Sequence, residues 1–399
     1  MTIGVIKKPR LGILTSHPIQ YQAPLFRELA GRFELEVFFA HRQTAVGQAA
    51  NGFGTPFEWD VDLLGGYRSR FLTNRAKHPS VSKFRGCDTP EIGRIISNKN
   101  FDVFLIMGWY LKSYLQGLWA CRRVGVKVMV HGDSRLATKR GSVKKALKEI
   151  GYPLLLRQFD ACLYVGKDNR EYLTHYGVPN CRLFFTPHCV DTLWFSSRAF
   201  SLAKTEAKKR LGLNANKPVV LFVGKLIETK RPGDLILAAG LLGRNRAEQQ
   251  LVMVGDGRLR SELEALACAQ EVSLTMLGFR NQSELPSIYR AADVLVVPSS
   301  AEETWGLVVN EAQACGVPVL LSDEVGCAND LVRDSSTGRV YSMGDVPALA
   351  KALKAVLDDP VESASIAEMT RRYSLAAAAD GIEKTVQSLM ETQQPRRRK

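Results

Sequence analysis

The chain has 399 residues, which exceeds the about 100 to 200 residues of an ordinary domain and therefore predicts roughly two domains. With 45% hydrophobic and 24% charged residues, the composition is that of a globular protein and excludes disorder of the whole chain. The net charge of +14 favours anionic partners such as nucleotide phosphates, nucleic acid or an acidic membrane face, although a solvated basic surface gives the same sum.

Cysteine usage and hydropathy bound the location of the protein. The eight cysteines are scattered, with no C-x-x-C pair and no histidine cluster at metal-ligand spacing, so we predict free thiols and a cytoplasmic protein. Residues 1–18 lack the sustained apolar segment of a secretory signal, and no run of about 18 apolar residues could span a membrane. We expect a soluble protein that contacts a membrane at most peripherally.

Short apolar runs alternate with longer helical patterns in the first half of the chain. The predicted strands are residues 11–16, 35–40, 102–108, 126–132, 161–166 and 182–187. Amphipathic stretches such as SYLQGLWACRRVG lie between several of these strands, and this alternation is typical of a doubly wound parallel sheet.

The second half repeats the pattern with runs that are more continuously apolar. The predicted strands are residues 219–225, 251–257, 274–278, 292–300 and 317–322. Such runs suit parallel strands buried on both faces, so we predict an α/β fold class with two Rossmann-like domains, residues 1–195 and 196–365. Residues 366–399 are expected to form a helix with a basic tail, which either caps the second domain or crosses back to the first.

In open parallel sheets, ligands bind outside the carboxyl ends of the strands, so two such domains that face each other enclose a cleft. Polar and aromatic residues follow several strands of the first domain. Those that we expect to face this cleft are Ser16, His17, Gln20, Tyr21, Trp109, His131, Asp133 and Arg135. The alternative for residues 16–22 is a capped turn before a helix that begins at Pro24, and the alternative for His131 is a structural histidine.

The stretch SSAEETWGLVVNEAQACGVPV, residues 299–319, places two carboxylates in an apolar setting. On a single helix Glu303 and Glu311 would lie roughly 80° apart and about 12 Å along the axis, which gives no reason for the pair. We predict instead a strand, a loop that carries Glu303, and a helix that starts at Gly306 or Leu307. The backbone N–H groups of Gly306, Leu307 and Val308 would then form an anion site, with glycine permitting close approach.

Two lysines follow the first strand of the second half. Lys225 comes directly after the strand and Lys230 lies in the next loop, where two ammonium groups can neutralise a diphosphate. Glycines follow the next strand in VGDGRLRS, although this is not the G-x-G-x-x-G of a dinucleotide site.

The segment EETWGLVVNEAQACGVPVLLSDEVGCANDLV resembles the E-x7-E signature of retaining GT-B glycosyltransferases of family 4, and the resemblance covers nearly all of the second domain. It implies the GT-B fold, a nucleoside diphosphate sugar donor, retention of configuration, and no metal or other cofactor. It assigns Glu303 to the sugar hydroxyls, Glu311 to the ribose, and His131 to the transferred sugar. The resemblance also implies contacts with the acceptor or the donor phosphates for the other first-domain residues, Ser16, His17, Gln20, Tyr21, Trp109, Asp133 and Arg135. The other residues that it implies near the donor are Gly224, Lys225, Lys230, Gly255, Gly278, Phe279, Arg280, Trp305, Gly306, Leu307 and Val308.

The sequence departs from the family at three places. Lys225 stands where an arginine is usual, which keeps the charge but loses the bidentate fork. The glycine-rich turn of many members is absent from the first loop, and relatives with a similar S-H-P-I-Q-Y block carry R-G-E-S where this chain has His131 to Ser134.

The function expected from these features is transfer of a sugar to an envelope glycan, a lipid-linked saccharide or a small glycoside. A nucleotide-sugar epimerase of the same architecture is the alternative, and a nucleic-acid-binding protein is a weaker one because no basic helix or RNA-binding aromatic motif occurs. A nicotinamide enzyme is disfavoured by the missing G-x-G-x-x-G. The D-x-D of Asp60 and Asp62, which binds metal in another glycosyltransferase fold, is expected to be incidental.

Overall fold

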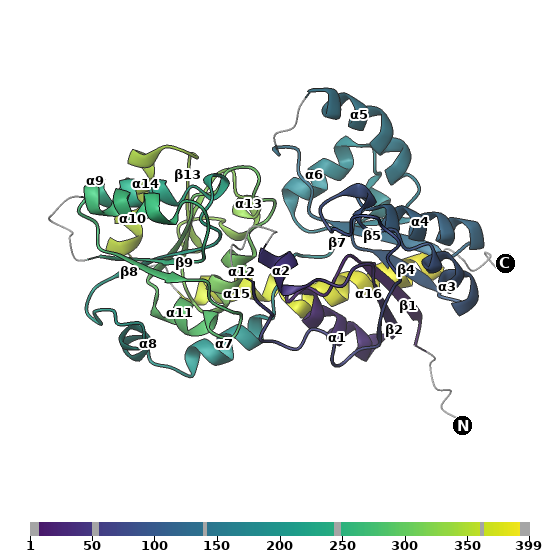
Figure 1. The fold of residues 1–399 in the computed structure, drawn as a ribbon, viewed down its shortest axis with the longest axis horizontal. Coiled ribbons are helices and arrows are strands. Elements are labelled where there is room, and N and C mark those ends of the chain that lie inside the picture. The colour runs from purple at the N-terminus through teal and green to yellow at the C-terminus, as the bar shows by residue number, and fades with distance from the viewer. Residues whose placement is uncertain (1–7, 50–55, 139–141, 243–248, 360–362, 392–399) are drawn as a thin grey trace.

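The computed structural model describes residues 8–49, 56–138, 142–242, 249–359 and 363–391, and these form two lobes side by side (Figure 1). Each lobe is built on one parallel sheet, with seven strands in the order β3-β2-β1-β4-β5-β6-β7 and six in the order β10-β9-β8-β11-β12-β13. In each sheet the chain starts in the middle, builds outward to one edge and then crosses to the other. The predicted α/β class with two doubly wound sheets is confirmed.

The first lobe contains most of the elements up to residue 185. Its strands are β1 (Arg10–Thr15), β2 (Glu34–Phe39), β3 (Ser69–Phe71), β4 (Val103–Ile106), β5 (Lys127–Gly132), β6 (Ala161–Tyr164) and β7 (Leu183–Phe185). Its α-helices are α1 (Gln22–Arg32), α2 (Ala45–Gln48), α3 (Glu91–Lys99), α4 (Lys112–Val124), α5 (Ser142–Leu156) and α6 (Lys167–His175).

The second lobe follows the same plan. Its strands are β8 (Val219–Val223), β9 (Gln250–Val254), β10 (Leu274–Gly278), β11 (Val294–Val297), β12 (Val319–Ser322) and β13 (Gly338–Tyr341). Its helices are α7 (Thr192–Phe200), α8 (Lys204–Arg210), α9 (Pro232–Leu241), α10 (Arg260–Ala269), α11 (Leu285–Ala291), α12 (Leu307–Ala314), α13 (Ala328–Leu331), α14 (Val346–Asp358) and α15 (Ser363–Arg372).

Two strands have no counterpart in the sequence prediction, and both are sheet edges. β3 and β13 pair with a neighbour on one side only, so they do not need the continuous apolar run that marks a strand buried between two others. The sequence of β3 is SRF and that of β13 is GRVY, with an arginine in each. The arginine in each strand interrupts the apolar run, which explains why periodicity did not find these two edges, whereas the more apolar edges β7 and β10 were predicted.

The last helix of the described chain, α16 (Leu375–Glu391), leaves the second lobe and packs on the first. Whereas α15 contacts α12, α16 contacts α1 and β7, and Figure 1 shows it extending alongside α1. Its buried face includes Ile382 and Val386, which join the core around Phe26. Arg32 on α1 forms ion pairs with Asp380 and Glu383 on α16, at 2.6 and 2.8 Å.

Each sheet is covered by apolar side chains on both faces, so each lobe has two core clusters. No helix among the described residues combines the length and apolarity needed to cross a membrane.

Candidate functional site

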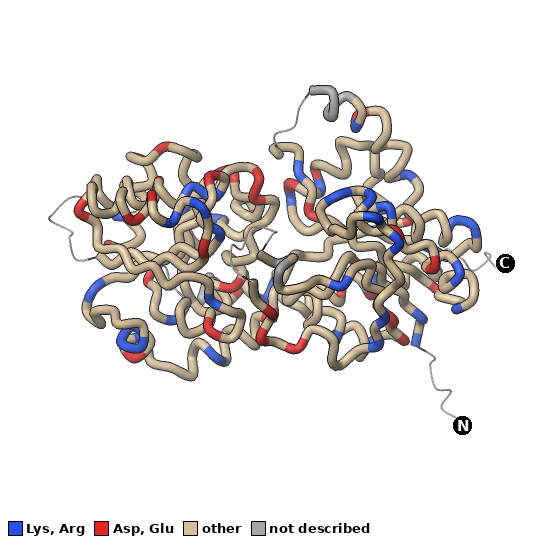
Figure 2. The backbone as a smooth tube through the Cα atoms, in the orientation of Figure 1, with Lys and Arg blue, Asp and Glu red and all other residues tan. Residues whose placement is uncertain are grey.

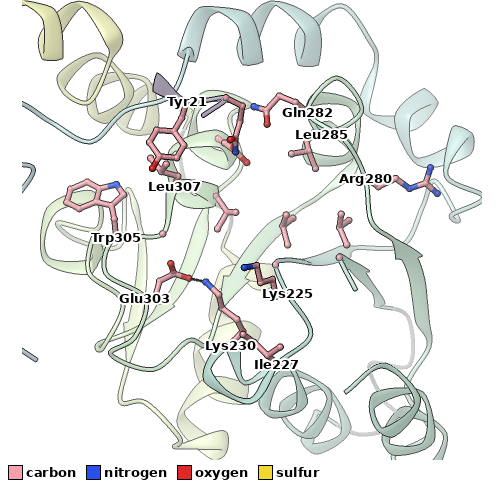
Figure 3. Close-up of a pocket in the computed structure, with 18 of the residues that line it drawn as sticks. Tyr21, Lys225, Ile227, Lys230, Arg280, Gln282, Leu285, Glu303, Trp305 and Leu307 are labelled. Atoms are coloured by element: carbon pink, nitrogen blue, oxygen red, sulfur yellow. Dashed lines mark hydrogen bonds and ion pairs between the residues drawn. The ribbon is translucent and has the colours of Figure 1, made fainter. Parts of the chain in front are cut away.

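A cavity of about 540 Å³ lies between the two lobes, lined by loops at the carboxyl ends of both sheets (Figure 3). The predicted residues that line it are Gln20, Tyr21, Asp133, Gly224, Lys225, Lys230, Gly255, Phe279, Arg280, Glu303, Trp305, Gly306, Leu307, Val308 and Glu311. The second lobe therefore presents nearly all of its expected residues to one space.

Glu303 and Lys230 form an ion pair at one side of the cavity, and Figure 3 shows the two side chains pointing toward each other. The Oγ of Ser299, two residues after β11, donates to the same carboxylate over 3.5 Å. Lys225 lies nearby, and burial, together with the charge of Lys230, lowers its pKa, while Glu303 opposes this shift. One carboxylate thus faces two ammonium groups, an arrangement that can exchange an internal ion pair for contacts to an anionic ligand.

The helix expected after Glu303 begins where the sequence predicted. Gly306 is the N-cap of α12 with φ of 98°, a left-handed conformation that disfavours any residue with a side chain. It supplies no capping side chain, and the first turn contains no acidic residue. The first turn therefore keeps its positive dipole end and its N–H groups at the cavity, the arrangement that binds anions at helix N-termini.

Glu311 lies on α12 and is not a surface residue, since its side chain is only 7% exposed. The hydroxyl of Tyr289 on α11 donates to Oε2 of Glu311 over 2.7 Å. Burial raises the pKa of Glu311 to about 7, although hydrogen bonds from Tyr289 and Gln282 oppose the shift. Glu303 and Glu311 thus reach one cavity from a loop and from a helix, in different electrostatic surroundings.

Two glycines bring the β8 and β9 loops together. Gly255 has φ of 127°, and a Cβ atom there would lie 1.9 Å from the carbonyl oxygen of Gly224. Only glycine permits this contact between the two backbones. Glycine at position 255 is therefore required for the packing of these two loops, whether or not the loop after β9 also contacts a ligand. Gly278, which ends β10, does not line the cavity.

The first lobe contributes a cluster of aromatic and imidazole rings next to the cavity, of which the sequence predicted Tyr21 and His131. The ring of His188 lies edge-on to Tyr21 at 5.2 Å, 6.2 Å from the ring of His131 and 6.0 Å from that of Trp305. Burial lowers the pKa of His131 to about 4 and that of His188 below its usual range. Of the two histidines it is His188 that lines the cavity, whereas His131 lies behind it.

Asp133 and Arg135 bind the second lobe directly. Oδ2 of Asp133 accepts from the hydroxyl of Thr304 over 2.6 Å. The Arg135 guanidinium, 5% exposed, donates to the carbonyl oxygens of Glu303 and Glu324 and pairs with Asp168. The structure therefore places Arg135 in the contact between the lobes, away from the cavity lining where an acceptor contact was expected.

The remaining residues of the first lobe also lie outside the lining. Trp109 is stacked on Tyr172 in the core of the lobe, with ring centroids 6.3 Å apart. Ser16 is bonded to His17 over 2.9 Å, and burial lowers the pKa of His17 to about 4. Sequence could mark these residues as following strands, but it could not distinguish those that turn back into the core.

Several lining residues were not predicted, among them Trp59, His188, Gln282 and Leu285. Trp59 directly precedes the D-x-D of Asp60 and Asp62, so the sequence signal for it is an aromatic residue beside a motif that was expected to be incidental. Asp60 accepts from Ser283, and Asp62 accepts from the backbone N–H groups of Leu64 and Gly65. Within the described parts of the chain, no group of three or more His, Cys, Asp or Glu residues is placed to hold a metal ion.

Comparison with known proteins adds the family. Residues 203–374 match the family described as glycosyl transferases group 1. A D-inositol 3-phosphate glycosyltransferase of Nocardiopsis dassonvillei is 30% identical over 307 residues, which are 72% of this chain and 69% of that protein. An alpha-D-kanosaminyltransferase of Streptomyces kanamyceticus is 34% identical over 201 residues, 47% of this chain and 51% of that protein.

The chain spans only about half the length of the kanosaminyltransferase and of two further D-inositol 3-phosphate glycosyltransferases that it matches. The fold extends further, since the Anabaena protein HepE in complex with UDP superposes with a TM-score of 0.71 at 18% identity, covering 96% of this chain and 100% of that one. The chain belongs to the glycosyl transferases group 1 family and has the GT-B fold.

Proposed function

We propose that the protein is a glycosyltransferase that moves a sugar from a nucleoside diphosphate sugar to an acceptor, with retention of configuration. The observation that carries the proposal is the convergence of Lys225, Lys230, Glu303 and the α12 N-terminus at Gly306 on one cavity between the lobes. A diphosphate needs cations and N–H donors, and a sugar needs an acceptor for its hydroxyls. The second-lobe side of this cavity offers the cations, the N–H donors and the acceptor.

The proposed reaction breaks the bond between the anomeric carbon and the β-phosphate oxygen and forms a bond from that carbon to the acceptor oxygen. Lys225, Lys230 and the N–H groups at Gly306 stabilise the negative charge that grows on the departing diphosphate. When Lys230 turns to the phosphate, the Glu303 carboxylate is released to accept from sugar hydroxyls. The acceptor proton passes to the departing phosphate oxygen on the same face, which is the route that retention implies.

The acceptor is proposed to bind on the side of the first lobe, near Gln20, Tyr21 and His188. Closing the cavity between the lobes excludes water, which would otherwise hydrolyse the donor. We further propose peripheral contact with an anionic membrane face, where an envelope glycan or lipid-linked saccharide would be presented. The observation that favours it is a row of exposed apolar side chains on α5.

The test is turnover with labelled UDP-, GDP- and ADP-sugars in the presence of envelope lipids, and the complex of HepE with UDP supports testing UDP-sugars first. We expect Glu303→Ala and Lys225→Ala each to lower turnover by roughly 100-fold or more. Lys354→Ala, which removes an exposed ion pair on α14, is the matched control and should behave as wild type.

Absence of transfer and hydrolysis with every donor, or full activity of Glu303→Ala, would overturn the proposal. NMR of a nucleotide sugar incubated without acceptor tests the epimerase alternative, because an epimerase converts its substrate alone, whereas a transferase leaves the configuration unchanged.

A further inference from the structure

A segment of the first lobe, Phe57–Asp60, crosses to the second lobe and lies against the loop that follows β10. The side chain amide of Asn281 donates to the carbonyl oxygen of Glu58 over 2.7 Å. The carboxylate of Asp60 accepts from the backbone N–H of Ser283 over 3.2 Å and from its hydroxyl. The segment is thus attached to residues 281–283 by both backbone and side chain contacts.

The residues that directly follow the segment are bound to the first lobe. Arg27 on α1 donates to the carbonyl oxygen of Gly65 over 3.1 Å and to that of Asp62. The turn itself is closed by the Asp62 carboxylate, which accepts from two following backbone N–H groups. The chain from Phe57 to Gly65 is therefore bound to the second lobe near its start and to α1 of the first lobe near its end.

Aromatic rings make this contact more than a polar bridge. Phe57 packs on Phe279 with ring centroids 4.3 Å apart and meets Trp59 edge-on at 4.9 Å. Trp59 and Phe279 both line the cavity, whereas Phe57 does not, so Phe57 lies behind the two rings and supports them. The outcome is an aromatic wall with one ring from each lobe facing the cavity.

This wall belongs to the end of the cavity away from the ion pair. Phe279 shares its loop with Arg280 and Gln282, and Figure 3 shows Arg280, Gln282 and Leu285 across the cavity from Glu303 and Lys230. Gln282 also bonds to Glu311. If the diphosphate lies at Lys225 and Gly306, the ribose next to Glu311 leads the base to this aromatic end.

We propose that Trp59 of the first lobe forms one wall of the donor-base pocket and stacks on the nucleobase, with Phe57 and Asp60 as positioning residues that hold it against the second lobe. The inference rests on the proposed nucleoside diphosphate donor. Flat aromatic surfaces bind bases through stacking with little dependence on base identity, so Trp59 adds affinity rather than a choice between bases.

A consequence is that base binding and the pairing of the lobes support each other. The groups proposed to bind the phosphates, Lys225, Lys230 and the N–H groups at Gly306, all belong to the second lobe, whereas a base stacked on Trp59 also contacts the first. A nucleotide then stabilises the attached position of Phe57–Asp60, whereas a ligand without a base does not.

The experiment measures dissociation constants of UDP, GDP and inorganic pyrophosphate by calorimetry with the full chain. We expect Trp59→Ala to weaken UDP and GDP by roughly tenfold and to leave pyrophosphate unchanged. Trp119→Ala is the matched control, because Trp119 is 52% exposed on α4 and does not line the cavity. Ser283→Ala keeps every ring and removes one hydrogen bond to Asp60, so it should weaken UDP binding by a smaller factor. This variant tests the inference even if Trp59→Ala does not fold.

Unchanged UDP binding in Trp59→Ala, with wild type binding normally, would overturn the inference and leave the proposed function intact. Equal weakening of UDP and pyrophosphate would also overturn it, since that result assigns Trp59 to the contact between the lobes only. If the wild type binds no nucleoside diphosphate at all, it is the proposed function that fails.

Discussion

Glu303 and Glu311 show how two acids of one motif acquire different chemistry from their neighbours. Glu303 is paired with the ammonium group of Lys230, whereas Glu311 is bonded to the neutral hydroxyl of Tyr289 and the amide of Gln282. Burial without a cation favours the protonated acid, which is why the pKa of Glu311 rises to about 7. Glu311 is therefore a carboxyl group that changes its charge near neutral pH.

This difference predicts a pH-dependent stability effect of Glu311→Gln. The pKa is raised from 4.5 to about 7 on folding, so the stability that this group contributes is present below pH 4.5 and is lost as pH rises through 7. Glutamine cannot ionise, and its amide oxygen can still accept from Tyr289, so the variant should gain stability relative to wild type between pH 5 and pH 8, by an amount on the order of 3 kcal/mol.

Thermal unfolding at the two pH values measures the effect. Glu264→Gln on the exposed face of α10 serves as control and should follow wild type at both. A difference in Tm between Glu311→Gln and wild type that is the same at pH 5 and pH 8 would contradict the assignment.

The sequence predicted the positions of these residues better than it predicted their burial and their hydrogen-bond partners. The positions of the strand ends and the E-x7-E spacing predicted that Glu303, Glu311 and Lys230 face one cleft, and all three line the cavity. The partner of Glu311 is Tyr289, 22 positions earlier on α11, and that contact depends on how α11 packs on α12. Spacing along the chain carries no information about it, so the burial of Glu311 could not be anticipated.

Among the elements, α12 has the clearest link between local geometry and binding. Gly306 holds the left-handed conformation that starts the helix, and an added Cβ would lie 3.3 Å from Cγ1 of Val325. We expect Gly306→Ala to lower stability by roughly 1–2 kcal/mol through backbone strain and to weaken pyrophosphate binding by roughly tenfold, because the methyl group blocks approach to the helix N-terminus.

Gly125→Ala is the matched control for Gly306→Ala. Gly125 ends α4 with φ of 78°, and a Cβ there would meet nothing within 4 Å. It should lower the Tm by a similar amount and leave pyrophosphate binding unchanged. Calorimetry of both variants separates strain from binding, and equal loss of affinity in both would argue against an anion site at α12.

The predictability of the strands follows the apolar runs in their sequences. The inner strands β8, β11 and β12 and the edges β7 and β10 were found from such runs, whereas the edges β3 and β13, with an arginine in each, were not. The segment Phe57–Asp60 has no regular structure at all. Its attachment to the second lobe depends on contacts with residues more than 200 positions away, which hydrophobic periodicity cannot detect.

The whole molecule is tied together by contacts distributed along the chain. Helix α16 returns to the first lobe, Arg135 binds the loop that carries Glu303, and Phe57–Asp60 binds the loop after β10. Charge gives less direction, since Figure 2 shows basic and acidic residues interspersed over both lobes. The net charge of +14 therefore does not by itself mark one binding face, and the apolar surface is more informative.

Helix α5 carries the surface that we expect to contact an anionic membrane. Leu147, Ile150 and Leu154 are 67, 72 and 60% exposed and lie within about 60° of one another around the helix. Residues 139–157 contain six Lys or Arg and one acid, so the charge of this stretch complements anionic lipid. An amphipathic helix with this composition gains from both apolar insertion and electrostatic attraction.

We expect wild type to co-float with vesicles that contain phosphatidylglycerol, and the double variant Leu147→Ser with Ile150→Ser to lose binding by roughly tenfold or more, because two inserted side chains contribute about 1.5–3 kcal/mol each. Leu193→Ser with Leu241→Ser is the matched control, since these side chains are 79 and 60% exposed on the second lobe. Equal flotation of the α5 variant and wild type would exclude α5 as the contact. A wild-type dimer in sedimentation that the α5 variant abolishes would instead assign this face to a second copy of the chain.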